Sequence, residues 1–273
     1  MTETKSVATA LRRYALGVEY DGSRFCGWQS QLSGGSVQDA VEAALAKIAD
    51  TSMIRVHCAG RTDSGVHALE QVIHFDTDVV RPDAAWVRGV NAHLPDAVAV
   101  RWAAVVPDDF HARFSAQARR YRYALLNRCS RPGLLNARVG WYHRPLNVEA
   151  MATAATQLLG KHDFSSFRAA ECQAKSPVKT LHVLDVRRQG DLILFDVEAD
   201  GFLQHMVRNL VGALIYVGNG KFPREWIGQL LAQHDRTHAA PTFSASGLYF
   251  LGARYDEKFG LPKVGADSTA LFL

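Results

Sequence analysis

The sequence lacks the features that mark membrane-spanning, secreted and zinc-ribbon proteins. No apolar run approaches the roughly 18 residues that a membrane helix needs, and residues 1–9 lack the apolar core of a signal peptide. The chain has only four cysteines, none of them in a Cys-x-x-Cys pair: Cys26, Cys58, Cys129 and Cys172. This spacing argues against a zinc ribbon and offers no disulfide framework. We therefore expect a soluble cytoplasmic protein with reduced thiols.

A strong excess of one charge is also missing. The 273 residues include 31 Lys and Arg against 27 Asp and Glu, which gives a formal net charge of +4 and a pI near 8.9. This bias permits a polyanionic partner but does not require one. Hydrophobic residues make up 48% of the chain, an ordinary globular composition that suffices for one large domain or two of moderate size.

The segment Cys58–His67 is the most informative one, because it places an arginine, a hydroxyl and a carboxylate between two glycines. Gly60 and Gly65 can adopt positive φ or allow another backbone to come close, so the loop can present Arg61 and Asp63 to a cleft. A carboxylate two residues from an arginine is held ionised, which suits a nucleophile or a base. A surface turn with a local ion pair is the alternative interpretation.

The first half of the chain predicts the order β-α-β-β-α-β. Alternating residues predict a strand over 14–20, and Ser36 with Asp39 predicts a partial capping box at the start of a helix whose apolar positions recur at helical spacing. The further elements are strands over 54–58 and 71–75, a helix over 83–92 and a strand over 98–105.

The second half predicts the same order. Its elements are strands over 121–126, 181–187, 192–198 and 248–255, and helices over 147–160, 203–216 and 223–234. Asn147 is the expected N-cap of the first helix and Gly160 its C-terminal stop. The repeat predicts an α+β protein of two ferredoxin-like halves, whose antiparallel sheets join around a central cleft that holds the substrate.

Several blocks of the chain resemble the tRNA pseudouridine synthase A family. Gly60–His67 is nearly identical to the family signature Gly-Arg-Thr-Asp-Ala-Gly-Val-His, with Ser64 in place of the common alanine. Similar blocks follow in family order and cover the chain from about residue 14 to 255: Glu19–Gly22, Gly27–Gln29, Asp108–Phe114, Arg120–Tyr123, Asp163–Arg168, His205–Asn209 and Gly247–Tyr249.

This resemblance implies the fold above and a tRNA pseudouridine synthase. The family converts uridine to pseudouridine at positions 38, 39 and 40 of the anticodon stem-loop, uses an aspartate that corresponds to Asp63, needs no cofactor and works as a homodimer. We expect a disordered tail at 1–13, an N-terminal domain with the catalytic loop at 14–108 and a C-terminal domain at 109–273.

The resemblance also implies roles for three further residues. Tyr121 corresponds to the active-site tyrosine, whose ring would stack on the flipped uracil, and Leu248 to an apolar pocket wall. Strand alternation over 119–123 predicts that Tyr121 and Tyr123 share one face and the arginines the other. The planar guanidinium of Arg61 is suited to stack where the extruded base was, although charge balance for Asp63 is the simpler alternative.

Five basic residues lie in blocks similar to family segments that face RNA, and phosphate contacts of this kind give salt-dependent affinity. They are Arg24, Arg168, Lys175, Lys179 and Arg208. Taken alone, each is better explained as a solvated surface charge. Arg208 is the best of them, because it lies in an otherwise apolar helix and must find an anion or leave the core.

Three other functions are alternatives to this one. A metal site at Cys58, Asp63, His67 and His74 lacks a second pair that would complete a coordination shell, and His74 is more simply a cross-strand packing residue. A non-enzymatic RNA-binding module would not need the Arg61 and Asp63 loop. An acid-base hydrolase would need a second carboxylate, and none is evident.

Overall fold

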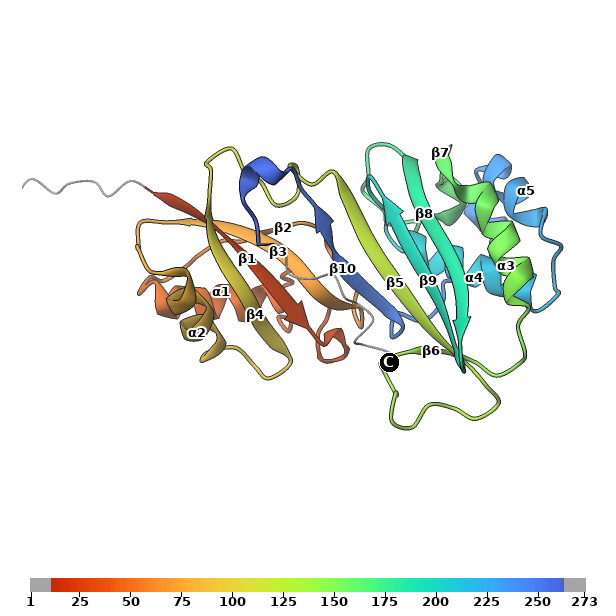
Figure 1. Ribbon diagram of the computed structural model, residues 1–273, viewed down its shortest axis with the longest axis horizontal. Helices are drawn as coiled ribbons and strands as arrows, with labels where there is room; N and C mark the ends of the chain where they lie inside the picture. The colour runs from red at the N-terminus through yellow and green to blue at the C-terminus, as the bar shows by residue number, and fades with distance from the viewer. Residues whose placement is uncertain (1–10, 263–273) are drawn as a thin grey trace, which may run out of the picture.

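The computed structural model describes residues 11–262, within which ten strands form one continuous sheet (Figure 1). Of the tail expected at 1–13, residues 1–10 lie outside the described residues. Its last two residues belong to the first strand, because β1 begins at Arg12 rather than at Tyr14. Within this part of the chain no helix is both long and apolar enough to cross a bilayer.

The N-terminal half has the predicted element order. Its elements are β1 (Arg12–Tyr20), α1 (Val37–Ile48), β2 (His57–Cys58), β3 (His67–Thr77), α2 (Asp83–Asn91) and β4 (Val98–Val106). Ser36 caps α1 as predicted, and the capping box is complete: the Asp39 N–H donates to Ser36 Oγ at 3.0 Å, and the Ser36 N–H donates back to the Asp39 carboxylate. The strand predicted over 54–58 is shortened to the two residues of β2.

The C-terminal half repeats the order with additions. Its elements are β5 (Ala118–Asn127), β6 (Gly140–Tyr142), α3 (Val148–Ala155), β7 (Gly160–Asp163), β8 (Val178–Gln189), β9 (Leu192–Ala199), α4 (Met206–Gly218), α5 (Trp226–Gln233) and β10 (Leu248–Arg254). Five 3-10 helices complete the described residues: η1 (Gly22–Arg24), η2 (Thr156–Leu158), η3 (Ser165–Phe167), η4 (Arg236–His238) and η5 (Glu257–Phe259). Asn147 caps α3 as predicted, but the short strands β6 and β7 were not predicted.

The strand order shows why the two halves form one sheet. Along the sheet it is β4-β1-β3-β10-β5-β9-β8-β7, so each half contributes the ferredoxin-like arrangement. Within each half the strands pair in antiparallel fashion, except that the short β6 lies parallel to β5. The halves join through a short parallel pairing of β3 with β10 at Tyr249↔His67 and Phe250↔Ala68. The two-ferredoxin prediction is therefore confirmed. The predicted domain boundary falls in the connection 107–117 between β4 and β5, and the division into domains stays a prediction.

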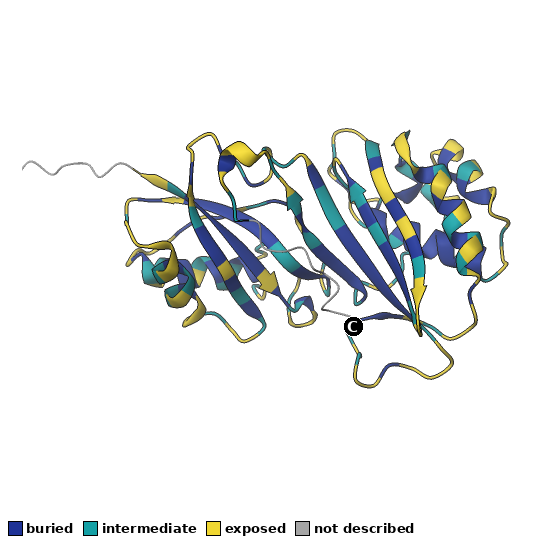
Figure 2. Ribbon diagram, in the orientation of Figure 1, coloured by how far each residue is buried: buried dark blue, intermediate teal, exposed yellow. Residues whose placement is uncertain are grey.

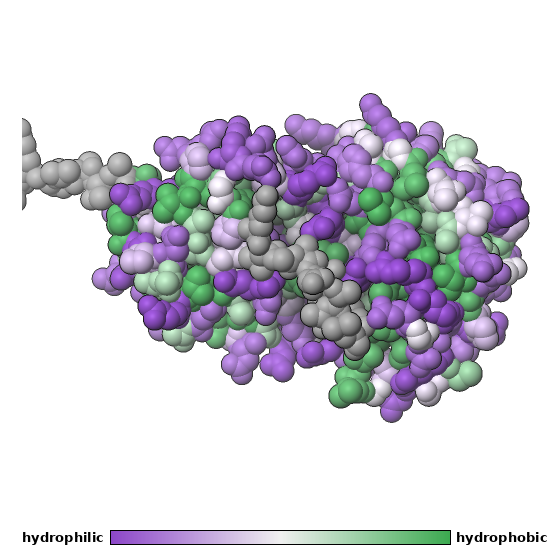
Figure 3. Space-filling view, viewed as in Figure 1, coloured by the Kyte–Doolittle hydropathy of each residue, from purple (hydrophilic) through white to green (hydrophobic). Residues whose placement is uncertain are grey.

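The helices cover one face of the sheet. Their apolar residues join the main core, in which Val41 and Leu45 of α1 and Leu214 of α4 are buried. Figure 2 shows the buried stretches of the helices and strands in dark blue. The opposite face, turned toward the viewer in Figure 1, has a smaller apolar cluster around Leu126 and Tyr249. Hydrophilic side chains cover much of this second face, with hydrophobic patches between them (Figure 3).

Candidate active site

The loop between β2 and β3 is fixed by polar contacts to buried side chains. The amide of Gln71, which is fully buried, donates to the Gly60 carbonyl at 2.5 Å and accepts from the Gly60 N–H at 3.3 Å. The hydroxyls of Tyr20 and Thr62 lie 2.8 Å apart in a second buried contact. Because these bonds hold residues 60–62, the position of Asp63 is determined before any substrate binds.

The glycines around this loop differ in their roles. Gly65 has the expected positive φ of 79°, but Gly60 does not have one. A positive φ of 92° occurs instead at Gly27, where a Cβ atom would lie 2.8 Å from the Thr62 carbonyl oxygen. Only glycine fits such a position without displacing the loop. Trp28, next to Gly27, donates its N–H to the Thr62 carbonyl at 3.0 Å and so supports the loop that carries Asp63.

Asp63 is paired with the other half of the molecule. Its Oδ2 accepts from Arg208 Nη1 at 3.0 Å and lies 3.5 Å from His205 Nε2. The side chains of Asp63, Arg208 and His205 are 26%, 16% and 28% exposed, so the carboxylate is partly open to solvent. The charge-assisted bond from Arg208 therefore orients the Asp63 carboxylate.

The predicted ionic partner of Asp63 is therefore wrong. Arg61 is exposed and forms no hydrogen bond or ion pair with any described residue, although its charge acts on Cys58. Two residues along an irregular loop do not fix two side chains on the same side. The guanidinium of Arg61 is thus left free in the structure, while Arg208, predicted as a contact to RNA, has the role expected of Arg61.

The first turn of α4 presents both partners of Asp63. His205, at the N-cap, has a left-handed backbone conformation with φ of 62° and ψ of 1°. Such a conformation is costly outside glycine, asparagine and aspartate, and strained residues of this kind cluster at functional sites. Arg208 follows within the first turn and also donates through Nε to the Phe243 carbonyl at 2.8 Å. Sequence analysis did not identify His205 as a site residue, although its neighbour Arg208 was singled out.

Tyr121 lies beside the same loop. It is 8% exposed, its ring packs against Phe202 and Phe250 at centroid distances of 5.1 and 5.0 Å, and a Cβ atom on Gly60 would lie 3.7 Å from its hydroxyl oxygen. Burial, with the nearby Tyr20 and Asp63 groups, raises the Tyr121 pKa far above its ordinary value, so the hydroxyl keeps its proton. That hydroxyl makes no hydrogen bond within residues 11–262.

The arginines beside Tyr121 only partly follow the prediction. Arg122 lies on the opposite face from Tyr121 and pairs with Asp196 through two bonds of 2.6 and 3.0 Å. Arg119, however, shares the face of Tyr121, because residues two apart on a strand point the same way. Its guanidinium donates to the carbonyls of Ala59 and Arg113 and so connects β5 to the start of the loop that carries Asp63.

The remaining predicted residues differ in burial and in their contacts. Leu248 is 5% exposed at the start of β10, opposite Tyr123. Arg24 and Lys175 are exposed and Lys179 is half-buried. Arg168 donates to the carbonyls of Cys172 and Ala174, so its guanidinium holds the loop after η3. The structure thus brings Asp63, Arg208 and Tyr121 together, whereas the other four basic residues form no ion pair with Asp63 among the described residues.

The residues of the alternative metal site each contact different parts of the protein. Burial raises the Cys58 pKa to about 12. His67 stacks on Tyr249 at 4.6 Å, and its Nδ1 accepts from the Gly22 N–H at 3.2 Å. His74 accepts from the Ala112 N–H at 3.1 Å. No group of three or more His, Cys, Asp or Glu side chains that could hold a metal occurs among the described residues.

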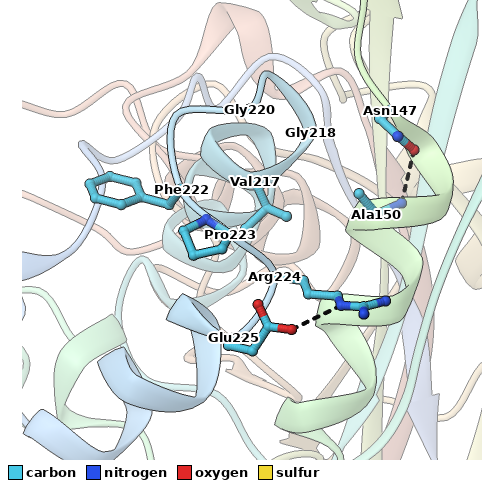
Figure 4. A pocket seen from close by; sticks show the side chains of 9 residues that line it. All are labelled: Asn147, Ala150, Val217, Gly218, Gly220, Phe222, Pro223, Arg224 and Glu225. Atoms are coloured by element: carbon cyan, nitrogen blue, oxygen red, sulfur yellow. Dashed lines mark hydrogen bonds and ion pairs between the residues drawn. The ribbon is translucent and has the colours of Figure 1, made fainter.

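A pocket of about 430 Å³ lies elsewhere, between the start of α3 and the turn after α4 (Figure 4). Its wall includes Asn147, Phe222 and Arg224, which pairs with Glu225. None of the predicted site residues lines it. The chemistry of the Asp63 loop is therefore not located in this pocket.

Comparison with known proteins shows the family of the chain. The tRNA pseudouridine synthase family model matches residues 17–115 and 154–256, which include Asp63, His205 and Arg208 but not Tyr121. The chain is 60% identical over 255 residues to a tRNA pseudouridine synthase A of Dechloromonas aromatica (strain RCB), covering 93% of this chain and 97% of that protein. It is 58% identical over 253 residues to the tRNA pseudouridine synthase A of Thiobacillus denitrificans (strain ATCC 25259 / T1), and the match covers 93% of this chain and 97% of that protein.

The match to solved structures is weaker. A chain from the crystal structure of a Cbf5-Nop10-Gar1 complex aligns with 87% of this chain and 48% of its own length, at 12% identity and a TM-score of 0.36, and no argument depends on it. The family model covers most of the chain, and the two relatives align over nearly their full length. The chain therefore belongs to the tRNA pseudouridine synthase A family.

Proposed function

We propose that this tRNA pseudouridine synthase modifies uridines at positions 38, 39 and 40 of the anticodon stem-loop, with Asp63 as the catalytic residue and without a cofactor. The observation that supports this most directly is the ion pair of Asp63 with Arg208 beside the Tyr121 hydroxyl. It provides an oriented, partly exposed carboxylate next to a protonated phenol. The resemblance of the loop to the family signature supplies the reaction.

The reaction is an isomerisation, so its atoms balance without an external reagent. The bond between ribose C1′ and uracil N1 breaks, a bond from C1′ to C5 forms, the C5 proton leaves and N1 gains a proton. An ionised Asp63 can add to the base, add to the sugar or remove a ribose proton, and each route begins from the same carboxylate. No electron is gained or lost, which is why no redox cofactor is required.

Tyr121 and Leu248 would form the walls for the uracil. In this proposal the ring of Tyr121 stacks on the base and its hydroxyl assists the movement of the C5 proton. Arg61 would stack in the space left by the extruded base, and its lack of an ionic partner leaves its planar group available for this.

The basic residues divide into two groups in this proposal. Arg24, Lys175 and Lys179 are the candidates for phosphate contacts, because they are exposed or half-buried. Arg168 and Arg208 already bond groups of the protein, so we assign them to holding the loop after η3 and to orienting Asp63. We further propose a cytoplasmic homodimer, by resemblance to the family.

The proposal is tested by mapping pseudouridine in tRNA from cells that lack this protein. Pseudouridine should disappear at positions 38, 39 and 40 and persist elsewhere. Plasmid-borne wild-type protein should restore it, and Asp63→Asn should not. Loss at other tRNA positions only, with 38–40 intact, would overturn the assigned target sites.

A further inference from the structure

The connection 107–117 between β4 and β5 carries an exposed phenylalanine. Phe114 is 76% exposed, yet its ring packs against His111 at a centroid distance of 4.3 Å and an interplanar angle of 33°. The Arg113 guanidinium lies 5.6 Å from the Phe114 ring centroid. An arginine and two aromatic rings are thus grouped at the surface in one short segment.

The backbone of this segment is held in place by His111. Its Nδ1 accepts from the N–H groups of Arg113 and Phe114 at 3.1 and 3.3 Å. The His111 ring also contacts His57 at 5.2 Å and the buried His74 at 4.5 Å. The Phe114 ring is therefore supported from within the protein, and its outer face is the one left open.

This segment adjoins the catalytic loop. The Arg119 guanidinium donates to the carbonyls of both Arg113 and Ala59, and Ala59 immediately precedes Gly60. The positive charges of Arg61 and Arg113 both lower the pKa of the Cys58 thiol, although burial raises it overall. Arg113 and Arg61 therefore both lie near Cys58, at the start of the loop that carries Asp63.

We propose that Phe114, together with Arg113, is a stacking platform for an unpaired base of the tRNA substrate that flanks the uridine at Asp63. An exposed ring supported from one side offers its free face to a base, and base–aromatic stacking requires no particular sequence. Arg113 adds a positive charge for the adjoining phosphate and can itself stack on a base. The inference rests on the proposed function for its substrate and names a contact outside the catalytic group.

The test compares binding of an anticodon stem-loop RNA to variants of the full chain by fluorescence anisotropy. Removal of one stacked ring in Phe114→Ala should weaken binding about 5- to 100-fold. Phe114→Leu should lose most of the same affinity because it retains apolar area but no ring, whereas Phe114→Tyr should stay within about twofold. Val105→Ala, which trims an exposed side chain on the edge strand β4, is the matched control.

A second measurement locates the base. With 2-aminopurine at single unpaired positions of the stem-loop, one position should be quenched by the wild-type protein and recover its fluorescence with Phe114→Ala. Thermal melts show whether each variant is folded. If Phe114→Ala and Val105→Ala bind the RNA equally, and bind whole tRNA equally, the platform does not exist.

A surface between copies of this chain is the competing occupant of the Phe114 ring. Sedimentation of the free protein distinguishes it, because dissociation of an oligomer by Phe114→Ala with unchanged affinity per subunit would overturn the proposal. The assay needs no turnover, so it is independent of the target positions. A wild-type protein that binds the stem-loop but modifies none of positions 38–40 would refute the proposed function and leave the platform to be decided by affinity alone.

Discussion

Arg208 and Asp63 form an ion pair across the junction of the two halves, with Nη1 3.0 Å from Oδ2. Arg208 lies in the first turn of α4 in the C-terminal half, and Asp63 lies in the loop before β3 in the N-terminal half. A second bond, from Arg208 Nε to the Phe243 carbonyl, fixes the plane of the guanidinium. The direction of the Asp63 carboxylate is therefore set by the way the halves join.

Arg208→Lys tests whether this guanidinium orients Asp63 or binds RNA. Lysine keeps the charge but cannot bond Asp63 and the Phe243 carbonyl in one plane. We expect single-turnover pseudouridine formation to fall at least about tenfold while the Kd for tRNA changes less than about threefold. A large loss of affinity with a salt dependence lowered by about one charge would instead make Arg208 a phosphate contact.

Tyr121→Phe separates the ring of Tyr121 from its hydroxyl. The ring contacts with Phe202 and Phe250 should persist, so thermal stability and RNA binding should stay close to wild type. Loss of a group that moves a proton should lower the rate about 10²- to 10⁴-fold in single-turnover assays. Tyr121→Ala, in comparison, should also destabilise the protein by about 3–5 kcal/mol in urea unfolding. A normal rate for Tyr121→Phe would limit this residue to packing.

Arg61→Lys tests the stacking role of the unpaired guanidinium. If Arg61 keeps the base out of its helix, lysine should slow the reaction more on a paired uridine than on one already unstacked, because only the first requires a few kcal/mol of unpairing. Single-turnover rates on two stem-loops that differ only in this pairing give the comparison. An equal loss on both would contradict the role.

The buried His74 should make the free energy of unfolding of the protein depend on pH. Its buried ring, with the charges of His111, Arg13 and His57 nearby, lowers the pKa from the ordinary 6.5 to about 3. Between these two values the unfolded chain binds a proton that the native ring does not, so the free energy of unfolding should fall as the pH falls from 6.5 toward 3. The slope from this group is about 1.4 kcal/mol per pH unit.

His74→Asn provides the control for that slope. The Asn carbonyl oxygen can accept the Ala112 N–H bond, but the side chain does not titrate. In urea unfolding between pH 4 and 7, the free energy of unfolding of the variant should therefore change less steeply with pH than that of the wild type. The difference in slope should correspond to about one bound proton. The same slope in both proteins would show that His74 does not titrate as described.

The parts of the fold that were predicted have local causes. The capping box of α1 requires only Ser36 and Asp39, three residues apart, and the facing of Tyr121 and Tyr123 follows from strand alternation. The two extra strands have weaker signals: β6 and β7 are three and four residues long and exist through pairing with β5 and β8. The prediction placed Arg119 on the wrong face because it assigned three neighbouring arginines to one face. Arg119 lies on the face of Tyr121, and Arg120 and Arg122 lie on the other.

The partner of Asp63 could not be derived in the same way. Asp63 and Arg208 are 145 positions apart, and their contact depends on the short parallel pairing of β3 with β10 that joins the halves. No periodicity within either half encodes that junction. The neighbouring Arg61 was a plausible partner by proximity in sequence, but the backbone of residues 60–62, held by Gln71 and Tyr20, directs the two side chains differently.

The central claim is that the Asp63 carboxylate performs the chemistry, and the purified Asp63→Asn protein tests it most directly. Asparagine keeps the shape of the side chain and removes its charge. Pseudouridine is measured in a single-turnover reaction with an anticodon stem-loop, alongside the Kd for the same RNA. Turnover should disappear while the Kd stays within about threefold of wild type. Substantial pseudouridine formation by Asp63→Asn would contradict it.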